Sequence, residues 1–529
     1  MTEHSSTLPA PGGPRPLRLP PTYASLVGLI AAVTLVRLAF IAWGPLTLAE
    51  DEAHYWEWSR YLDWSYYSKG PGVAWAIWLS VSILGDTELA VRLPALLASA
   101  IGAYACARLA IDAFGGVRAG IAAAAVWLAA PAFQIVSVLM TIDGPMLACW
   151  ALGTWAGWHA IRGGRTAWLA LGATLAIGFL FKYTAVLLLP GIAIAAMLDR
   201  TAKIRTPWML LGLAVALLGV LPIAIWNASH DWATVRHLLG HLGVAGGDQP
   251  TTTAEAEGAS YSPLWTLEMI GYLFAIGGPA FALGITGALH ARRNLMGRSI
   301  GAVTYCIATA APVLLLYFVV SFFTRIEANW PMAGLVGFVP IAGWAAVRAL
   351  ARPDIGLKVA WRATVFTALL GIGALLAIAG TGLTKSDLPL IPLQRATGLD
   401  TLAESTQAKL DELEQETGLA GFVMAIHYGR ASQLSFALDT HPTVFGVSSH
   451  FGGGRRTQYD LWPHTDLTRP EANEPLLGRP AVLFDGALAD WRRVFDRVVE
   501  IESLPGESKP HRQTFLGYGF RGLANNPEP

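Results

Sequence analysis

The chain has 529 residues, of which 53% are hydrophobic and only 14% are charged, against roughly 25% in an ordinary soluble domain. Its formal net charge is zero, so no bulk basic character indicates a nucleic-acid partner. The three cysteines all lie inside apolar runs, which indicates small buried side chains, not a disulfide framework or a metal site.

Residues 1–22 are rich in Pro, Gly and Ser and contain no apolar run, so we predict a disordered cytoplasmic tail. We expect no cleavable signal, because the first apolar segment is too long and too strongly apolar for a signal core. A membrane helix needs roughly 20 apolar residues, and the sequence offers about eleven such spans. We predict these spans at 24–43, 89–111, 118–138, 144–161, 166–181, 183–198, 207–226, 264–289, 300–322, 331–349 and 363–383.

Basic residues are distributed unequally between the connections of this predicted topology. With the N-terminus in the cytoplasm, the cytoplasmic connections hold most Arg and Lys side chains, as the positive-inside rule requires. These are Arg118, Arg162, Arg165, Arg200, Lys203, Arg205, Arg292, Arg293, Arg298, Arg348, Arg352, Lys358 and Arg362. The opposite connections are longer and hold few basic residues. The asymmetry supports the predicted orientation.

Two segments have to be interpreted in a particular way for this asymmetry to hold. The apolar segment 71–84 must be a re-entrant or interfacial helix, because a full crossing there would invert every later connection. The segment 166–198 must form two short helices that turn near Lys182. The 44–88 loop, Asp143, Lys182 and the Phe323–Trp330 segment then all lie on the extracytoplasmic face.

Charged residues become frequent after residue 384, and no further span fits there. We therefore predict a membrane domain over 23–383 and a small soluble α/β domain over 384–529 on the extracytoplasmic side, with a linker around Pro389 and Pro392. Hydrophobic patterning predicts strands at Gly421–Ile426, Thr443–Val447 and Ala481–Phe484, and helices at Tyr428–Leu438 and Ala487–Val499. The predicted fold class is mainly α and polytopic, with this α/β domain attached.

The loop after the first span is unusually polar and aromatic. Asp51 and Glu52 begin it, and in a helix Asp51 and His54 share one face. Carboxylates in a first helical turn commonly complement the helix dipole, but their position at the end of a membrane span favours a functional role. Seven aromatic residues follow that we expect at the lipid head groups: Tyr55, Trp56, Trp58, Tyr61, Trp64, Tyr66 and Tyr67.

Two lysines and one aspartate are further candidates. Lys69, in Tyr-Tyr-Ser-Lys-Gly-Pro-Gly, is either a lysine that snorkels to the interface or a cation for a phosphate. Asp143 lies between two spans with almost no loop, as an N-cap or as a functional acid. Lys182 has no acid beside it in sequence, so it needs Asp143 or a lipid phosphate as its partner.

Three loops complete the set of candidates. In the Phe323–Trp330 segment, Arg325 is a candidate for an anion and Glu327 and Asn329 for hydroxyl groups, unless the segment is an ordinary solvated loop. Residues 455–463 line the site from above or form a charged surface loop, which is the favoured interpretation for any single residue there. The histidines of 228–262 stand at no convincing metal spacing. No nucleotide-binding or zinc-hydrolase motif appears.

Together, Asp51-Glu52 after the first span, the Tyr-Tyr-Ser-Lys-Gly-Pro-Gly turn, Asp143 and Lys182 in Phe-Leu-Phe-Lys-Tyr resemble the GT-C superfamily of polyprenyl-phosphate-sugar glycosyltransferases. More narrowly, the chain resembles the bacterial protein O-mannosyltransferase-like branch that includes the lipid A aminoarabinose transferase. The resemblance covers roughly 24–350. The chain departs from the family at Gly70, where relatives carry proline, and at His54, where relatives often carry arginine shortly after the acid pair.

The resemblance implies a multi-pass inner-membrane enzyme that moves a sugar from a polyprenyl-phosphate donor to a lipid-linked, glycan or protein acceptor among membrane lipids. It implies an inverting displacement, with Asp51 as the general base and Glu52 and Asp143 as orienting acids. The substrate- and phosphate-binding candidates are Lys69, Lys182, Arg325, His54, Tyr67, Glu327 and Asn329. No cofactor is required, and no pattern supports a divalent metal.

Three other functions compete with this one. A transporter or flippase of lipid-linked glycans would show paired hydrophobic halves with broken helices at mid-membrane, and the sequence has no clear internal repeat. A non-catalytic lipid-binding scaffold would not need Asp51. An enzyme of the same superfamily that moves a whole oligosaccharide, or builds the lipid-linked sugar itself, differs only in its substrate.

Overall fold

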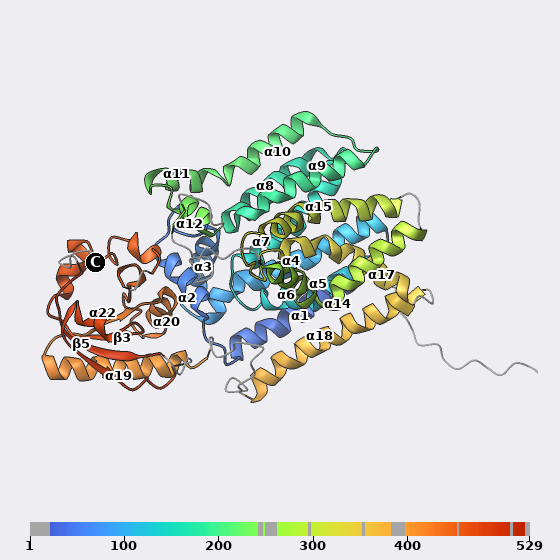
Figure 1. Ribbon diagram of the computed structural model, residues 1–529. Coiled ribbons are helices and arrows are strands. Elements are labelled where there is room, and N and C mark those ends of the chain that lie inside the picture. The colour runs from blue at the N-terminus through green and yellow to red at the C-terminus, as the bar shows by residue number, and fades with distance from the viewer. Residues whose placement is uncertain are drawn as a thin grey trace, which may run out of the picture.

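The computed structural model describes residues 22–241, 247–248, 262–294, 298–351, 355–381, 397–451, 454–507 and 512–523. Residues 1–21 of the predicted tail and the predicted linker lie outside these residues. A bundle of long helices forms one end of the molecule, and a smaller part that contains the sheet forms the other (Figure 1).

The bundle begins with α1 and ends with α18. Its elements are α1 (Tyr23–Trp43), α2 (Glu50–Arg60), α3 (Gly72–Leu84), α4 (Glu88–Phe114), α5 (Val117–Ala129), α6 (Pro131–Ile135), α7 (Asp143–Ala160), α8 (Arg165–Phe181), the 3₁₀ turn η1 (Tyr183–Leu187), α9 (Leu188–Leu198), α10 (Thr206–Leu218), α11 (Leu221–Ser229), α12 (Ala233–His241), α14 (Pro263–Asn294), α15 (Arg298–Val320), α16 (Met332–Val336), α17 (Phe338–Ala351) and α18 (Ile355–Thr381).

Six helical stretches of the described chain are long and apolar enough to cross a membrane, so the predicted count of about eleven is not confirmed. They are Tyr23–Trp43, Glu88–Phe114, Thr206–Ser229, Pro263–Arg293, Ile300–Val320 and Met332–Ala351. Several other predicted spans form shorter apolar helices, among them α5, α8 and the η1–α9 stretch. Helix α3 has 13 residues, or about 20 Å at 1.5 Å per residue, which is less than the bilayer core of about 30 Å.

Local chemistry explains where two predicted spans divide. The predicted span 118–138 is broken because Pro131 has no backbone N–H to continue α5, which ends at Ala129, and instead opens α6. The predicted turn near Lys182 is confirmed: α8 ends at Phe181, and Lys182 is extended, with φ −149° and ψ 127°, before η1 begins.

The C-terminal part is an α/β domain, as predicted, with a five-stranded sheet in the order β2-β1-β3-β5-β4. Its elements are α19 (Leu399–Thr417), β1 (Phe422–Ala425), α20 (Tyr428–Ala437), β2 (Phe445–Gly446), α21 (Pro470–Asn473), β3 (Ala481–Phe484), α22 (Leu488–Arg492), β4 (Phe495–Ile501) and β5 (Thr514–Phe520). Strands β2, β1 and β3 are parallel, and β5 runs antiparallel to β3 and β4. β1 and β3 are buried along their whole length, as strands of a parallel sheet usually are.

The predicted helix over Ala487–Val499 is wrong beyond Arg492. The helix α22 stops there, and the following residues form β4, which pairs with β5 through Phe495 and Phe520 and through Ile501 and Thr514. The buried positions Trp491, Phe495 and Val498 fit helical spacing, so the sequence pattern favoured a helix. Pairing with a distant strand decided the outcome.

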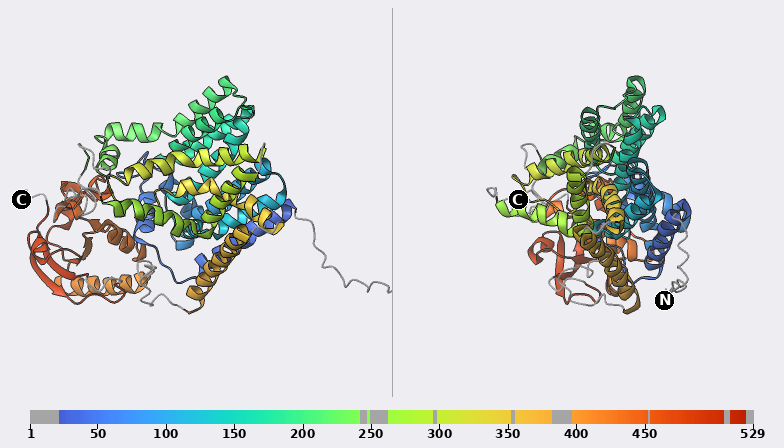
Figure 2. Two further views of the ribbon diagram at one scale, coloured as in Figure 1. Left: turned by 45° about the vertical axis from the view of Figure 1, so that its right-hand side comes forward. Right: turned by 90° about the vertical axis from the view of Figure 1, so that its right-hand side faces the viewer.

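The α/β domain is joined to the bundle mainly through the short helix α2. Helix α20 packs along α2, with the Trp56 ring 5.0 Å from the Phe436 ring and the amide of Gln433 donating to the carbonyl of Leu48 at 2.8 Å. Figure 2 shows the sheet-containing part at the same end of the bundle in a second view. The loop that follows the first helix is therefore enclosed between the two parts of the protein.

Candidate active site

A cavity of about 460 Å³ lies where the first loop, the start of α7, the turn after α8 and the α/β domain meet. Most of the sequence-predicted site residues line it: Asp51, His54, Tyr67, Lys69, Asp143, Lys182, Glu327 and Asn329. These residues come from widely separated segments, and the expectation that the segments converge at one level of the bundle is confirmed. The membrane face on which the cavity opens stays a prediction.

Asp51 stands in the first turn of α2, with its side chain exposed toward the cavity. Its Oδ1 accepts a hydrogen bond from the hydroxyl of Tyr428 at 3.0 Å. Within the described residues, Oδ2 of Asp51 has no hydrogen-bond partner in the protein. Asp51 therefore has one oriented oxygen and one oxygen free to accept a proton.

Asp143 is the first residue of α7 and is buried against two partners. Lys182 Nζ donates to its Oδ1 at 2.7 Å, and the amide nitrogen of Asn329 donates to its Oδ2 at 2.9 Å. The extended backbone at Lys182 lets the ammonium reach back toward α7. Both carboxylate oxygens of Asp143 are thus occupied, so this residue is suited to hold Lys182 and Asn329 in place.

Lys69, unlike Lys182, has no ion-pair partner among the described residues. None of the described carboxylates lies within ion-pair distance of its ammonium group. Its loop lies against the end of α8, because a Cβ at Gly70 would stand 2.3 Å from the carbonyl oxygen of Leu180. A larger residue does not fit there, which explains why this turn has Gly70 in place of proline.

Burial lowers the pKa of the Lys69 ammonium to about 8. Repulsion from Lys182 acts in the same direction, while Asp51 and Asp143 act against it. A poorly solvated lysine with no bound counter-ion is a ready partner for an oxyanion.

Glu52 does not line the cavity, so the structure does not support an orienting role beside Asp51. Its carboxylate forms a bidentate pair with Arg92 of α4, at 2.9 and 2.7 Å, and also accepts from the backbone N–H of Ala49 and Met140. Both charged side chains are at most 2% exposed. The pair fixes the start of α2 on the bundle, and it gives the buried charge of Arg92, inside the apolar helix α4, a partner.

Arg325 is also placed away from the cavity. Its guanidinium pairs with Glu268 at 2.8 Å and is 61% exposed. The expected contact of Arg325 with a substrate phosphate is therefore not supported. Glu327 and Asn329, two and four residues later, do reach the cavity, because the chain turns between Glu327 and Trp330.

His54 lines the cavity, but both of its ring nitrogens are engaged. Nδ1 contacts Ser432 Oγ at 3.0 Å, and Nε2 accepts from the indole N–H of Trp58 at 3.1 Å. Burial lowers the pKa of His54 to about 3, with repulsion from His427 and Arg455 in the same direction. The imidazole is neutral at physiological pH, so it links α2 to α20 and supplies no charge to a phosphate.

The aromatic residues of the loop are mostly buried, contrary to the expectation of a head-group belt. Trp56, Trp58 and Tyr66 are at most 1% exposed, and Trp64 is the large exposed side chain of the group. Tyr67 is buried too: its hydroxyl donates to Asp248, and its backbone N–H donates to Gln458 Oε1 at 2.7 Å. Trp56 packs against Phe436 and His441 of the α/β domain, whereas Trp58 and Tyr66 stack on each other within the loop.

The α/β domain supplies one wall of the cavity, through Tyr428, Arg455, Arg456, Thr457 and Gln458. The sequence contained a signal for the arginine loop, since it follows a glycine run. It contained none for Tyr428, which begins an ordinary amphipathic helix. No group of three or more His, Cys, Asp or Glu side chains is arranged for a metal ion anywhere in the described ranges. Metal independence stays a prediction.

Comparison with known proteins agrees with this architecture. The sequence profile of the family described as dolichyl-phosphate-mannose-protein mannosyltransferase matches residues 68–226. The lipid A galacturonosyltransferase RgtD of Rhizobium johnstonii is 28% identical over 324 residues, which are 60% of this chain and 64% of that protein. The chain thus spans a little less than two thirds of that relative's length.

Two solved structures share the fold. ArnT from Cupriavidus metallidurans in the apo state aligns with a TM-score of 0.60 and 14% identity, over 93% of this chain and 98% of that one. The same protein bound to undecaprenyl phosphate aligns with a TM-score of 0.61 and 15% identity, over 94% and 98%. The predicted resemblance to the GT-C glycosyltransferases is confirmed, and the chain is a multi-pass membrane protein.

Proposed function

We propose that the protein transfers a sugar from a polyprenyl-phosphate donor to a lipid-linked acceptor, with the cavity below the α/β domain as its active site. One observation carries the proposal: Asp51, with a free carboxylate oxygen, and Lys69, a cation with no ion-pair partner among the described residues, line the same cavity. A carboxylate base and an unpaired cation in one partly enclosed site are what a displacement with an anionic leaving group requires.

In the proposed reaction the acceptor hydroxyl attacks the anomeric carbon of the sugar. A bond forms between the acceptor oxygen and that carbon while the bond from the carbon to the phosphate oxygen breaks. Oδ2 of Asp51 takes the hydroxyl proton, and polyprenyl phosphate leaves with the bonding electrons. A single displacement of this kind inverts the anomeric centre.

The cations of the cavity stabilise the leaving phosphate. Lys69 binds it directly, and Lys182, which Asp143 holds in position, is the second contact. The partly enclosed, low-dielectric site makes these interactions stronger than in bulk water. The relatives point to the substrates: one of the solved structures contains undecaprenyl phosphate, and the name of the curated relative states lipid A as its acceptor.

The topology predicted from the charges puts this site on the extracytoplasmic face of the inner membrane. Polyprenyl-phosphate sugar and a lipid acceptor would then both reach it from the outer leaflet. The role of the α/β domain is to close the site from above and to orient Asp51 through Tyr428.

The direct test uses the purified full-length protein in lipid nanodiscs with lipid A and a panel of undecaprenyl-phosphate sugars that includes galacturonic acid. Release of undecaprenyl phosphate that depends on lipid A is the expected result, with at least a hundredfold loss in Asp51→Asn. Full turnover of Asp51→Asn would remove the general-base assignment. Movement of the intact donor between leaflets without any release would favour a flippase instead.

A further inference from the structure

A second cavity, of about 820 Å³, lies at the opposite end of the bundle from the proposed active site. Helix α7 begins at Asp143, in the first cavity, and reaches the second one at Trp158, roughly 22 Å further along its axis at 1.5 Å per residue. Figure 1 shows the connection between α9 and α10, which borders the second cavity, at the end of the bundle remote from the α/β domain. The two cavities are therefore separate.

One side of this second cavity is charged. Arg162, in the connection after α7, donates to Oδ2 of Asp199 at 2.8 Å, and its guanidinium stands 3.2 Å from the centre of the Trp158 ring. The other oxygen of Asp199 accepts from the backbone N–H and the hydroxyl of Thr201, at 2.9 and 2.6 Å. Both oxygens of Asp199 are thus occupied, and its charge compensates that of Arg162.

Arg200 supplies a second guanidinium, and no carboxylate within the described ranges pairs with it. The backbone N–H of Lys203 donates to the carbonyl of Ile161 at 2.7 Å, so the connection that carries Arg200 is fixed to the one that carries Arg162. Two guanidinium groups and one carboxylate leave the cavity with one positive charge in excess. Three further exposed basic side chains lie on or directly beside these two connections: Arg165, Lys203 and Arg205.

The rest of the cavity is largely apolar. Leu198 and Ile300 line it, and Leu198 is 61% exposed, as expected of a side chain that faces lipid. At Gly301, near the start of α15, a Cβ would meet no other atom within 4 Å, so the cavity is open at this position. Its volume lies in the range of ligand sites, roughly 300–1,000 Å³.

These features match a phospholipid better than a soluble anion. Basic pockets between membrane helices on the cytoplasmic side bind anionic lipid head groups. The distribution of basic residues predicts that this end of the bundle is cytoplasmic. A soluble anion would leave the apolar part of the cavity in contact with water, whereas an acyl chain would cover it.

We propose that this second cavity binds the head group of an anionic phospholipid of the cytoplasmic leaflet. Arg200 binds the phosphate, beside the pair of Arg162 and Asp199. An acyl chain packs along Leu198 and Ile300. The bound lipid joins the end of α9 to the start of α15 and stabilises this end of the bundle, independently of sugar transfer at the other end.

The test measures binding of three probes to the purified full-length protein in detergent: phosphatidylglycerol, phosphatidylcholine with the same acyl chains, and inorganic phosphate. Native mass spectrometry across a lipid titration gives the affinities. Phosphatidylglycerol is expected to bind at least roughly fivefold more tightly than phosphatidylcholine, and inorganic phosphate is expected not to displace it. Arg200→Gln should weaken phosphatidylglycerol binding roughly fivefold, because one basic residue is lost, and leave phosphatidylcholine binding unchanged.

Gly301→Leu tests the cavity without a change of charge. The leucine side chain enters open space, so it should weaken phosphatidylglycerol binding roughly tenfold, while the unfolding midpoint of the lipid-free protein does not fall. The matched control is Gly271→Leu in α14, where a Cβ also meets no other atom within 4 Å and which does not line the cavity. This variant should bind the lipid as wild type does.

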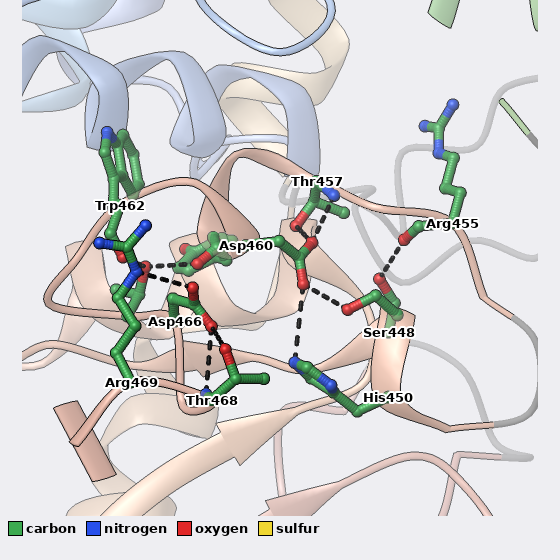
Figure 3. A network of polar contacts seen from close by, with 12 residues as sticks. Ser448, His450, Arg455, Thr457, Asp460, Trp462, Asp466, Thr468 and Arg469 are labelled. Carbon is green, nitrogen blue, oxygen red and sulfur yellow. Dashed lines mark hydrogen bonds and ion pairs between the residues drawn. The ribbon is translucent and has the colours of Figure 1, made fainter. Parts of the chain in front are cut away.

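Two arginines control for charge. Arg118 follows α4, whose Asp112 contacts His159 near the end of α7 at 2.9 Å, so it lies at the same end of the bundle without lining the cavity. Arg469 lies in the α/β domain, where it pairs with Asp466 at 3.0 Å (Figure 3). Arg118→Gln and Arg469→Gln should each leave the affinity for phosphatidylglycerol unchanged.

Three results would overturn the site. If Arg118→Gln weakened binding as much as Arg200→Gln, general attraction between a basic surface and an anionic lipid would explain it. Equal affinities of wild type for phosphatidylglycerol and phosphatidylcholine would show that the charge is not recognised. Displacement of phosphatidylglycerol by inorganic phosphate would assign the cavity to a soluble anion.

Discussion

The hydroxyl of Tyr428 donates a hydrogen bond to Oδ1 of Asp51 at 3.0 Å, across 377 positions of sequence. Asp51 begins the first short helix after the membrane span, and Tyr428 begins the helix that packs on it. Burial raises the pKa of the Tyr428 hydroxyl above its usual value, and the negative charge of Asp51 raises it too. The hydroxyl therefore stays protonated and donates the hydrogen bond. The α/β domain thus fixes the orientation of the proposed base.

Tyr428→Phe removes this hydrogen bond and leaves the ring packing in place. We expect kcat to fall roughly tenfold, because Asp51 is less well oriented, while KM for the donor is unchanged. Steady-state kinetics at saturating acceptor separate the two parameters. A rise in KM with unchanged kcat would show that Tyr428 binds substrate and does not position Asp51.

Donor binding should weaken as the pH rises through about 8. The pKa of Lys69 is lowered to about 8, so its ammonium is charged below this pH and becomes neutral above it. Because the phosphate binds the charged form, the Kd for undecaprenyl phosphate should increase between pH 7.5 and 9. Calorimetry in buffers of different ionisation enthalpy should detect proton uptake near pH 8.

The control for this prediction is Lys69→Arg. An arginine in solution stays protonated throughout this range, so the pH dependence of donor binding should disappear even where affinity is lower. If wild type and Lys69→Arg showed the same pH dependence, another group would be responsible.

Asp143 and Lys182 should contribute to the thermal stability of the protein as a coupled pair. Their side chains are 3% and 13% exposed, so removal of one partner leaves the other charge poorly solvated. We expect Asp143→Asn and Lys182→Met each to lower the unfolding midpoint by several degrees, and the double variant to lose less than the sum. The Arg162–Asp199 pair, whose members are 28% and 18% exposed, is the control and should show a smaller coupling.

Glu57 should make stability depend on pH. Burial raises the pKa of Glu57 from its ordinary 4.5 to about 7, although Arg60 and Ser435 lower it in part. The folded state therefore binds the proton more tightly than the unfolded state. The stabilisation of the folded state by the protonated Glu57 is complete below pH 4.5, and it is lost as the pH rises through about 7.

Glu57→Gln imitates the protonated form, so its unfolding midpoint at pH 8 should exceed that of wild type by roughly 2–4 °C, with little difference at pH 5. Thermal unfolding of both proteins across this range measures the effect. If Glu57→Gln raised the unfolding midpoint by the same amount at pH 5 and pH 8, the cause would be packing and not proton binding.

The sequence by itself determined the local features of the site. The lengths of the apolar runs identified a membrane bundle. The distribution of basic residues predicted the turn at Lys182. It also predicted that Asp51, Lys69, Asp143 and Lys182 lie on the same face, and these four residues line one cavity. Such inferences succeed because a membrane constrains each segment independently, through its length and its flanking charges.

Only the tertiary structure decided which of these polar residues face the cavity. Glu52 is a carboxylate like Asp51, and Arg325 is a cation like Lys69, but Arg92 and Glu268, far away in sequence, bind them elsewhere. Trp56 is buried where Phe436 and His441 of the α/β domain pack on it, and β4 is a strand because β5 pairs with it. Partner choice for a charge or a strand edge depends on long-range contacts, which no local pattern records.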